Sequence, residues 1–460
     1  MATAVSPLRA AVEAPLPPGP RGAAALASGA AFARDPWFYP QKIAARYGDV
    51  ARLPMPFTDL ILLSHPDHIA HVNLKAPDRY ERSPMVTDSM RVQGSPHHAS
   101  WFDERDEEWA RGRQLLQPHF TQKALAELGG LFTEAIVDEV GGWAREADGD
   151  GVLDLEAPLK ELALSVLYNA MFSRRIDEQE MPHLLERLDE RMVATTVRTA
   201  MFSLPVRVPR PLSRKGSEAD GWLDAHLAVI VAARRANPIE TTDLLNVLLD
   251  ATYEDGTPLE DLKVRTEMLF LVIGGHETTA AALAWAFALL ATTPDVAARV
   301  YDEVDALGDK PLGPADMEQL SLVRACFDEA QRLQGGLVFN PKRAVVDDEI
   351  GGYRIPAGAT VIHSNIALQR DPRFWGPNAG EYRPDRWLDG AIDNAAFQNF
   401  GRGKRMCLGK RMAYIEAVLT IATAFQRYRF QAPAGWTPRH HYRMSMGVKG
   451  GVPLTLTRRR

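Results

Sequence analysis

Apolar residues recur at helical spacing through the middle of the chain and alternate with polar residues nearer its two ends. Helical periodicity predicts helices over 36–47, 66–74 and most of 108–307, with a break near 204–215 where three prolines fall close together. Residues 83–106 show no clean period and predict a long loop. Strands are predicted at 50–53, 59–63, 343–346, 352–355 and 360–363, and a hairpin over 444–456 that turns at Gly450-Gly451. The pattern therefore predicts a fold that is mainly α with a minor β region.

The longest apolar stretch covers 268–290, which is long enough to cross a bilayer. His276 and Glu277 lie at its middle and would be costly in lipid, so we expect a long helix buried at the centre of a globular domain. Gly274 and Gly275 precede them, and each costs about 1 kcal/mol relative to alanine in a helix interior. A flat ligand lying against the backbone, or a local opening of the helix, would offset that cost.

A single cysteine carries the most specific chemistry of the chain. Cys407 follows a glycine-bearing loop and precedes a helix predicted over 408–427. The positive end of the helix dipole stabilises a thiolate, and so do nearby cations, which here are Arg402, Lys404, Arg405, Lys410 and Arg411. A thiolate with an open position opposite it suits haem iron that activates dioxygen, because the sulfur donates electron density toward the O–O bond. The alternative is a buried structural cysteine beside a basic surface loop.

Composition narrows the class of protein further. The 460 residues are 46% hydrophobic, enough for a large core, and the net charge of −6 gives no reason to expect nucleic-acid binding. Cys326 and Cys407 are the two cysteines, so no disulfide framework can form, which suits a reducing compartment. We expect a flexible Ala/Pro-rich start over 1–22 without a membrane anchor, one domain over 23–460, and a cytoplasmic location.

The run from Phe400 to Gly409 reads Phe-x-x-Gly-x-Arg-x-Cys-x-Gly, and it resembles the haem-ligand loop of the cytochrome P450 superfamily. The resemblance implies the fold of that family, with haem b between the long central helix and the cysteine loop. It also implies that Cys407 is the axial ligand of the iron and that dioxygen is a co-substrate. Haem contacts are then expected from Phe400, Gly403, Arg405 and Gly409.

Within the central helix, 274–279 reads Gly-Gly-His-Glu-Thr-Thr and resembles the oxygen-activation segment of the same family. The resemblance implies that Thr278 and Glu277 deliver protons and that Gly274 and Gly275 open space for dioxygen beside the haem. Ordinary helix polarity, with threonine hydroxyls bonded to the preceding turn, is the alternative. A zinc-protease motif is excluded because position 280 is alanine.

Charged residues outside the two motifs also match family positions. Glu329 and Arg332 lie three residues apart on a helix, and the resemblance adds Arg386 to a buried cluster that supports the cysteine loop. Propionate contacts are implied for Trp109, Arg113 and Arg343 in addition to Arg405. Each of these arginines could instead be an ordinary surface residue. Gly335-Gly336 stands where relatives commonly have a proline pair, which leaves the shape of the following loop open.

Position along the family fold nominates Leu271, Val338, Phe339, Met444 and Ser445 as lining a substrate pocket. Because that surface is largely apolar, we expect a hydrophobic substrate such as a terpenoid, fatty acid or polyketide, as in secondary metabolism. The chain carries no flavin or iron–sulfur motif, so a ferredoxin and its reductase are expected to supply electrons at the basic face around Cys407. The expected assembly is a monomer. A peroxide-dependent or isomerising member of the fold, or a haem-binding sensor without turnover, is the alternative.

Overall fold

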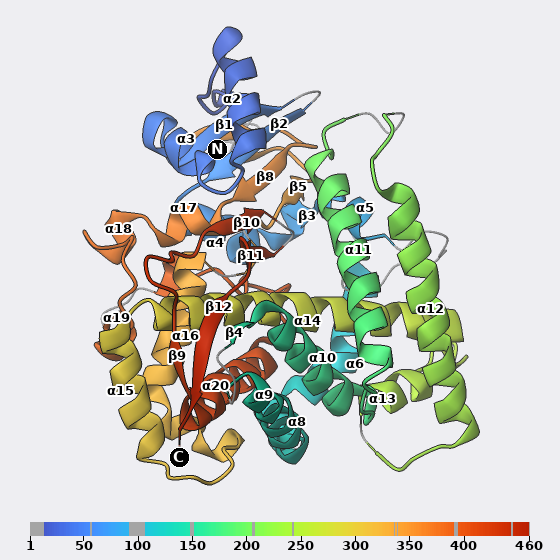
Figure 1. The fold of residues 1–460 in the computed structure, drawn as a ribbon. Coiled ribbons are helices and arrows are strands. Elements are labelled where there is room, and N and C mark those ends of the chain that lie inside the picture. The colour runs from blue at the N-terminus through green and yellow to red at the C-terminus, as the bar shows by residue number, and fades with distance from the viewer. Residues whose placement is uncertain are drawn as a thin grey trace, which may run out of the picture.

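The computed structural model describes residues 13–55, 58–91, 106–147, 151–204, 208–241, 243–334, 336–337, 339–390, 394–442 and 445–459. Helix α14, Asp261–Ala291, runs through the middle of the molecule (Figure 1). The helices packed against it are α10 (Glu156–Phe172), α12 (Ser213–Ala236), α13 (Leu244–Asp250), α15 (Pro294–Asp305), α16 (Ser321–Gln334) and α20 (Lys410–Arg427). By length and composition alone, α14 could cross a bilayer, but most of its apolar surface is buried in the core. The predicted central helix is therefore confirmed.

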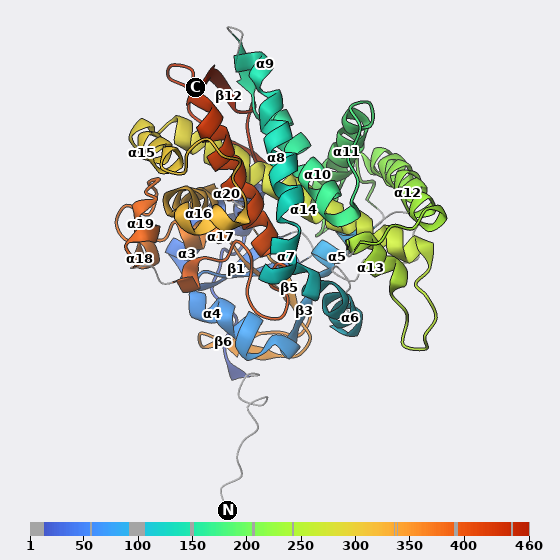
Figure 2. The same cartoon turned by 90° about the horizontal axis from the view of Figure 1, so that it is seen from below.

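The remaining helices surround this centre. Helix α11 lies alongside α12 at one side of the molecule, and α8 lies alongside α20 (Figures 1 and 2). Their bounds are α2 (Ala23–Arg34), α3 (Tyr39–Tyr47), α4 (Pro66–Ala70), η1 (His71–Lys75), η2 (Pro77–Arg79), α5 (Pro84–Met90), α6 (Asp106–Leu116), η4 (Gln117–Phe120), α7 (Gln122–Glu127), α8 (Gly129–Gly142), α9 (Ala144–Ala147), α11 (Glu180–Ala200), η5 (Pro314–Gln319), α17 (Asn365–Gln369), α18 (Pro372–Trp375), α19 (Asp385–Leu388) and η6 (Asn394–Ala396).

The largest sheet has the strand order β1-β2-β8-β5-β3. Its strands are β1 (Val50–Met55), β2 (Thr58–Leu63), β3 (Tyr80–Arg82), β5 (Lys342–Ala344) and β8 (Thr360–His363). Strands β2 and β8 are parallel, with Leu60 opposite Thr360, and the other neighbours are antiparallel. A small antiparallel pair joins β6 (Asp348–Ile350) to β7 (Tyr353–Ile355). The strands predicted at 50–53, 59–63, 343–346 and 360–363 therefore meet in one sheet, at the top of Figure 1, whereas the one predicted at 352–355 is β7 of the small pair.

The predicted hairpin over 444–456 is wrong. Strand β11 (Met446–Val448) pairs with β10 (His440–Tyr442), whereas β12 (Pro453–Arg458) pairs with β9 (Tyr428–Gln431) and β4 (Val152–Asp154). Gly450 and Gly451 do have positive φ angles, 81° and 78°, so the turn residues were correctly recognised. After this turn the chain enters a different sheet, in which the partners of β12 come from segments that are distant in sequence.

Two further local predictions differ from the structure. Part of the expected loop over 83–106 is the helix α5, which Ser83 caps by accepting a hydrogen bond from the Met85 amide at 3.3 Å, with Pro84 at its first position. The expected flexible start is ordered over its described part. The carbonyl of Pro15 accepts from the Arg354 amide, and that of Pro18 accepts from the Arg52 amide.

Candidate active site

The loop before α20 holds Cys407 in a tight turn. The Cys407 amide donates to the Phe400 carbonyl at 2.8 Å, and the Met406 amide donates to the Gly403 carbonyl at 3.0 Å. Gly403 has φ 78°, and a Cβ there would lie 2.2 Å from the Asn73 carbonyl oxygen of η1. Only glycine allows this close approach of two backbones. The loop is therefore seated against η1, and Gly409 is the N-cap of α20.

The Cys407 side chain is exposed, unlike Cys326, which is buried. Its surroundings act on the thiol in both directions. The sulfur is accessible from a cavity but is surrounded by protein atoms, and this loss of solvation raises the pKa of Cys407 overall. Hydrogen bonds from the amides of Gly409 and Lys410 and the charges of Arg113 and Lys410 oppose the rise. Amide donors and cations of this kind stabilise a thiolate that binds a metal. Among the five cations predicted around the sulfur, Lys410 lowers the pKa of Cys407 in this way.

Two of the other predicted cations, Lys404 and Arg405, have partners of their own. The guanidinium of Arg405 lies 4.8 Å from the ring centre of Trp109, and Lys404 pairs with Asp78 at 3.1 Å. Arg113 donates to the Met406 carbonyl at 2.7 Å, so it braces the cysteine loop directly. Trp109 and Arg113 both lie on α6, at the four-residue spacing that places them on one face.

Two arginines change the expected picture of the cationic site. Arg343 pairs with Glu81 across the β3–β5 ladder, where the two residues are in register. Its expected propionate role therefore competes with this carboxylate. Arg82, which the sequence did not nominate, lies on β3 close to Arg405. Burial, together with the charge of Arg405, lowers the pKa of Arg82 to about 9, so the Arg82 guanidinium is still charged at neutral pH. Two neighbouring cations favour an anion between them.

The two glycines of α14 serve different purposes. Gly274 is exposed although it lies in the middle of a buried helix, and a Cβ added there would meet nothing within 4 Å. It therefore faces an open space. A Cβ on Gly275 would lie 2.5 Å from Leu167 Cδ1 on α10. Gly275 thus allows the close packing of α10 on α14. The motif predicts instead that Gly275 opens space for dioxygen, and the contact with Leu167 does not match that role.

Thr278 and Glu277 point in different directions. The Thr278 hydroxyl donates to the Gly274 carbonyl at 2.6 Å, on the open side of the helix. The carboxylate of Glu277 is buried and accepts a hydrogen bond from the Ser445 hydroxyl at 2.7 Å. His276 is also buried, and desolvation lowers its pKa to about 3, so it is neutral.

Glu329 is the centre of a buried charge cluster. Its carboxylate accepts two hydrogen bonds from Arg332 and one from Arg386, each at 2.8 Å, and a further one from the Trp387 indole at 2.9 Å. Glu329 and Arg332 are fully buried. Arg332 also donates to the Gln369 carbonyl. The predicted contacts of this cluster are confirmed, and Trp387 joins it.

The cluster reaches the cysteine loop through Gln369. The Gln369 side chain accepts from the Gln398 amide at 3.0 Å and donates to the Asn399 side chain at 2.9 Å. Residues 398 and 399 directly precede Phe400, whose ring lies 5.3 Å from that of Tyr414 on α20. The contacts of Gln369 and of Tyr414 therefore hold the cysteine loop on both sides of Cys407.

The predicted pocket residues are only partly brought together. Leu271 is buried on α14, while Phe339 stacks on Trp37 at 5.8 Å and lies near Phe32. Ser445 is 1% exposed and bonded to Glu277, so its position does not match the expected substrate contact. Val338 and Met444 lie outside the described residues.

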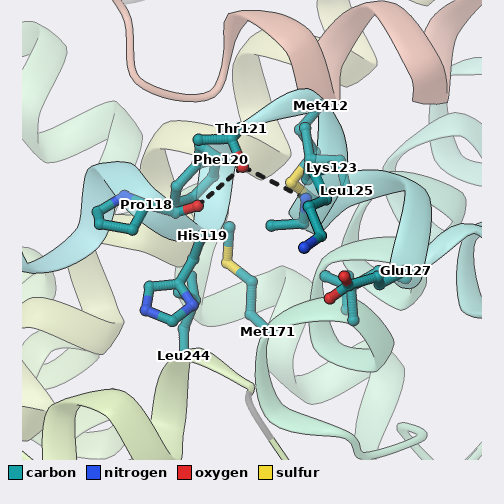
Figure 3. A pocket seen from close by; sticks show the side chains of 13 residues that line it. Pro118, His119, Phe120, Thr121, Lys123, Leu125, Glu127, Met171, Leu244 and Met412 are labelled. Carbon is teal, nitrogen blue, oxygen red and sulfur yellow. Dashed lines mark hydrogen bonds between the residues drawn. The ribbon is translucent and has the colours of Figure 1, made fainter.

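Two cavities lie on the side of the cysteine loop. The larger, about 1320 Å³, reaches Cys407 from between α6, α7, α8, η5 and α20, and we name it the Cys407 groove. Its basic lining is Arg113, Arg324, Lys410 and Arg411, and its acidic lining is Glu134, Asp138 and Glu318. The smaller cavity, about 300 Å³, is shown in Figure 3. Met171 and Met412 enter it among Phe120, Thr121 and Lys123, and none of the predicted site residues lines it.

The residues present fit an iron porphyrin with two carboxylates. Cys407 offers a thiol on an exposed face, backed by amide donors. Gly274 faces open space on the central helix, as a flat ligand requires. Arg82 and Arg405 form a cationic pair suited to a propionate, and Arg113 lies nearby. The site therefore offers one thiolate as a ligand for the iron and a group of cations for the carboxylates at the edge of the porphyrin.

Comparison with known proteins agrees with this geometry. The family model described as "Cytochrome P450" matches residues 17–455. The chain is 30% identical to cytochrome P450 132 of Mycobacterium tuberculosis over 90% of its own length and 91% of that protein. It is 27% identical to cyclooctat-9-en-7-ol 5-monooxygenase of Streptomyces melanosporofaciens, covering 85% of this chain and 84% of the other. A crystal structure of the cytochrome P450DA heme domain superposes with a TM-score of 0.82 at 24% identity, over 97% of this chain and 98% of that one, and shows the same fold. The chain belongs to the cytochrome P450 family and is a monooxygenase that uses haem iron and dioxygen.

Proposed function

We propose that this enzyme inserts one oxygen atom into an apolar small molecule, with haem b held by Cys407 and with electrons from a ferredoxin and its reductase. The observation that carries the proposal is the exposed Cys407 thiol at the start of α20, with the amides of Gly409 and Lys410 directed at the sulfur. When bound, the haem supplies dioxygen binding and reduction, after which one oxygen atom enters the substrate and the other leaves as water.

The residues of α14 would manage protons and space. Gly274 leaves room beside the helix, and the Thr278 hydroxyl lies on the same open side. Its proton is held by the Gly274 carbonyl, so Thr278 would accept a hydrogen bond at the dioxygen site as it stands and would donate one only after its side chain rotates away from that carbonyl. Glu277 is the acid that exchanges protons between the interior and solvent. The apolar residues around it, such as Leu271 and Ile273, keep bulk water out.

Around the haem edge, Arg405 and Trp109 would bind one propionate, with Arg82 added from the structure and Arg113 supporting the same side. Arg405 is held over the Trp109 ring, and Arg82 approaches Arg405 from β3. Phe400, Gly403 and Gly409 would contact the porphyrin from the cysteine loop. Arg343 is a second candidate for binding a propionate. It is paired with Glu81 in the structure, and a propionate would have to compete with that carboxylate.

The Cys407 groove is where we propose that the ferredoxin docks. Its basic residues Arg113, Lys410 and Arg411 lie beside the thiolate ligand and would attract an acidic partner. Glu134 and Asp138, at another part of the groove, are both paired with Arg175. Arg175 therefore offsets one of their two negative charges. Docking here gives the electron its shortest route to the sulfur.

We propose a hydrophobic substrate of the terpenoid, fatty-acid or polyketide kind, because Leu271, Phe339 and their neighbours offer apolar contacts. A relative that the chain matches over most of its length is named as a monooxygenase of cyclooctat-9-en-7-ol, an alcohol without a charged group. The Gly335–Gly336 position leaves the loop toward Phe339 free of the usual prolines. We place the enzyme in the cytoplasm as a monomer.

The test is turnover of the haem-loaded protein with ferredoxin, ferredoxin reductase and a panel of apolar substrates. Candidates are first selected by the shift of the ferric Soret band that displacement of the sixth ligand produces. We expect a hydroxylated or epoxidised product that requires dioxygen and the ferredoxin. Product formed from hydrogen peroxide alone, without the ferredoxin, would establish the peroxide-dependent alternative. A ligand-induced spectral shift with no product under either condition would establish the sensor.

A further inference from the structure

A hydrogen bond joins the middle of α14 to the residue that directly precedes strand β11, near the C-terminal end of the chain. The Ser445 hydroxyl donates to Glu277 Oε1 at 2.7 Å, across 168 residues of sequence. Ser445 is 1% exposed and Glu277 is 6% exposed, so solvent does not compete for this contact. The residue expected to touch the substrate touches the proton-handling acid instead.

The direction of Glu277 follows from helix geometry. Successive residues of an α-helix are separated by about 100°, so Glu277 and Thr278 leave α14 on different faces. Thr278 bonds back to the Gly274 carbonyl at 2.6 Å, and Glu277 turns toward β11. No hydrogen bond joins the two side chains within the described part of the chain. The orientation of Glu277 is therefore set by Ser445 and not by Thr278.

A second contact fixes the strand β11 that directly follows Ser445. The Trp285 indole, eight residues after Glu277 on the same side of α14, donates to the Met446 carbonyl at 2.8 Å. Trp285 is fully buried. The start of β11 is thus held on α14 at two neighbouring points. Only the one at Ser445 involves a titratable group.

A buried carboxylate is costly unless donors satisfy it, and hydrogen bonds to charged groups are stronger than neutral ones. Without the Ser445 hydroxyl, the Glu277 side chain would either rotate toward another donor or be left with an unsatisfied buried oxygen. Either change would alter the acid that exchanges protons with the dioxygen site. The hydroxyl is small, buried and matched to one carboxylate oxygen, as a fixed support requires.

We propose that Ser445 is a positioning residue for Glu277: it holds the carboxylate in one orientation, so that proton delivery stays coupled to product formation. The inference rests on the proposed proton role of Glu277. It assigns Ser445 a function in the oxygen-activation site, in place of a substrate contact. No covalent step is added, because Ser445 only donates a hydrogen bond.

The test compares S445A, E277Q, the S445A/E277Q double variant and the control W285F in the haem-loaded enzyme. W285F removes the other anchor of the same strand and leaves the Ser445–Glu277 bond in place. The first readout is the infrared carboxylate band of Glu277 in the resting protein, identified as the band that E277Q removes. The second readout is product formed per NADH consumed, with hydrogen peroxide release measured in parallel.

We expect S445A to shift the Glu277 band and to lower coupled product formation by roughly tenfold. This loss is smaller than the rate factor of about 10²–10⁴ that a general acid contributes. W285F should leave both readouts near those of the parent enzyme, and S445A should add nothing in the E277Q background. An unshifted band in S445A, or equal losses of coupling in S445A and W285F, would overturn the proposal. The infrared readout needs no substrate, so it decides the positioning role even if the proposed monooxygenase reaction on apolar substrates fails.

Discussion

Replacing each central glycine of α14 by alanine should separate two roles that the sequence motif presents as one. In G274A the new methyl group meets no atom within 4 Å, so the helix gains propensity without a clash. In G275A the methyl group lies 2.5 Å from Leu167 Cδ1. Leu167 is 1% exposed and packed in the core between α10 and α14, so it cannot move aside freely.

The magnitudes follow from these contacts. Alanine in a helix interior is favoured over glycine by about 1 kcal/mol, which is the stabilisation expected for G274A. Overpacking a core by one methyl group costs about 1–3 kcal/mol, so G275A should change stability by about 0–2 kcal/mol in the unfavourable direction. The free energy of unfolding of G274A should therefore exceed that of G275A by about 1–3 kcal/mol.

Urea denaturation followed by far-UV circular dichroism measures both values in the same buffer. The matched control is L167A, alone and combined with G275A, because a smaller residue at position 167 gives the new methyl group its space. We expect G275A to cost less in the L167A background, with a coupling energy of about 0.5–3 kcal/mol. A G275A protein as stable as G274A, or strictly additive effects of G275A and L167A, would refute the packing role of Gly275.

Three other changes have defined outcomes. E329Q should lower the free energy of unfolding by about 3–5 kcal/mol, because it leaves buried cations such as Arg386 uncompensated, and a loss below about 1 kcal/mol in urea denaturation would contradict this. R82Q should speed haem transfer to apomyoglobin by roughly tenfold if one charged hydrogen bond of about 1.5 kcal/mol to a propionate is lost, and an unchanged rate would exclude Arg82 from that role. For His276 the pKa is lowered in the folded state to about 3, so its stabilising contribution is complete above the unfolded value of 6.5 and declines as the pH falls toward 3. H276N should therefore reduce the loss of stability between pH 6.5 and pH 4.5 by about 2–3 kcal/mol, and denaturation curves that match the parent at both pH values would contradict it.

The parts of the site that short motifs encode are predictable from the sequence. Cys407 and its loop, the helix around Gly274, and the pair of Glu329 and Arg332 depend on residues that are close in sequence or at helical spacing. Arg386 lies 57 residues from Glu329, and only the resemblance to the cytochrome P450 family nominated it. The roles of their neighbours depend on contacts between distant segments. Gly275 packs against α10, and its sequence context does not distinguish this from a ligand contact.

Long-range strand pairing accounts for most of the remaining differences. The alternating pattern over 444–456 is the same whether its two halves pair with each other or with separate strands, and the structure has the latter. Arg343 lies opposite Glu81 only because β3 and β5 are adjacent. Arg82 on β3 is close to Arg405 of the cysteine loop, more than 300 residues further along the chain. The helix α5, in contrast, begins with Ser83-Pro84, a capping signal that was available in the sequence.

The absorption spectrum of the dithionite-reduced, haem-loaded protein under carbon monoxide tests most directly whether Cys407 binds the iron as a thiolate. The account predicts the strongly red-shifted Soret band of a thiolate–iron–carbonyl complex in the parent protein, and its absence in C407S. A Soret band at the shorter wavelength typical of histidine or thiol ligation, in freshly prepared protein, would contradict thiolate ligation. Failure to bind haem at all would contradict the assignment of the whole site.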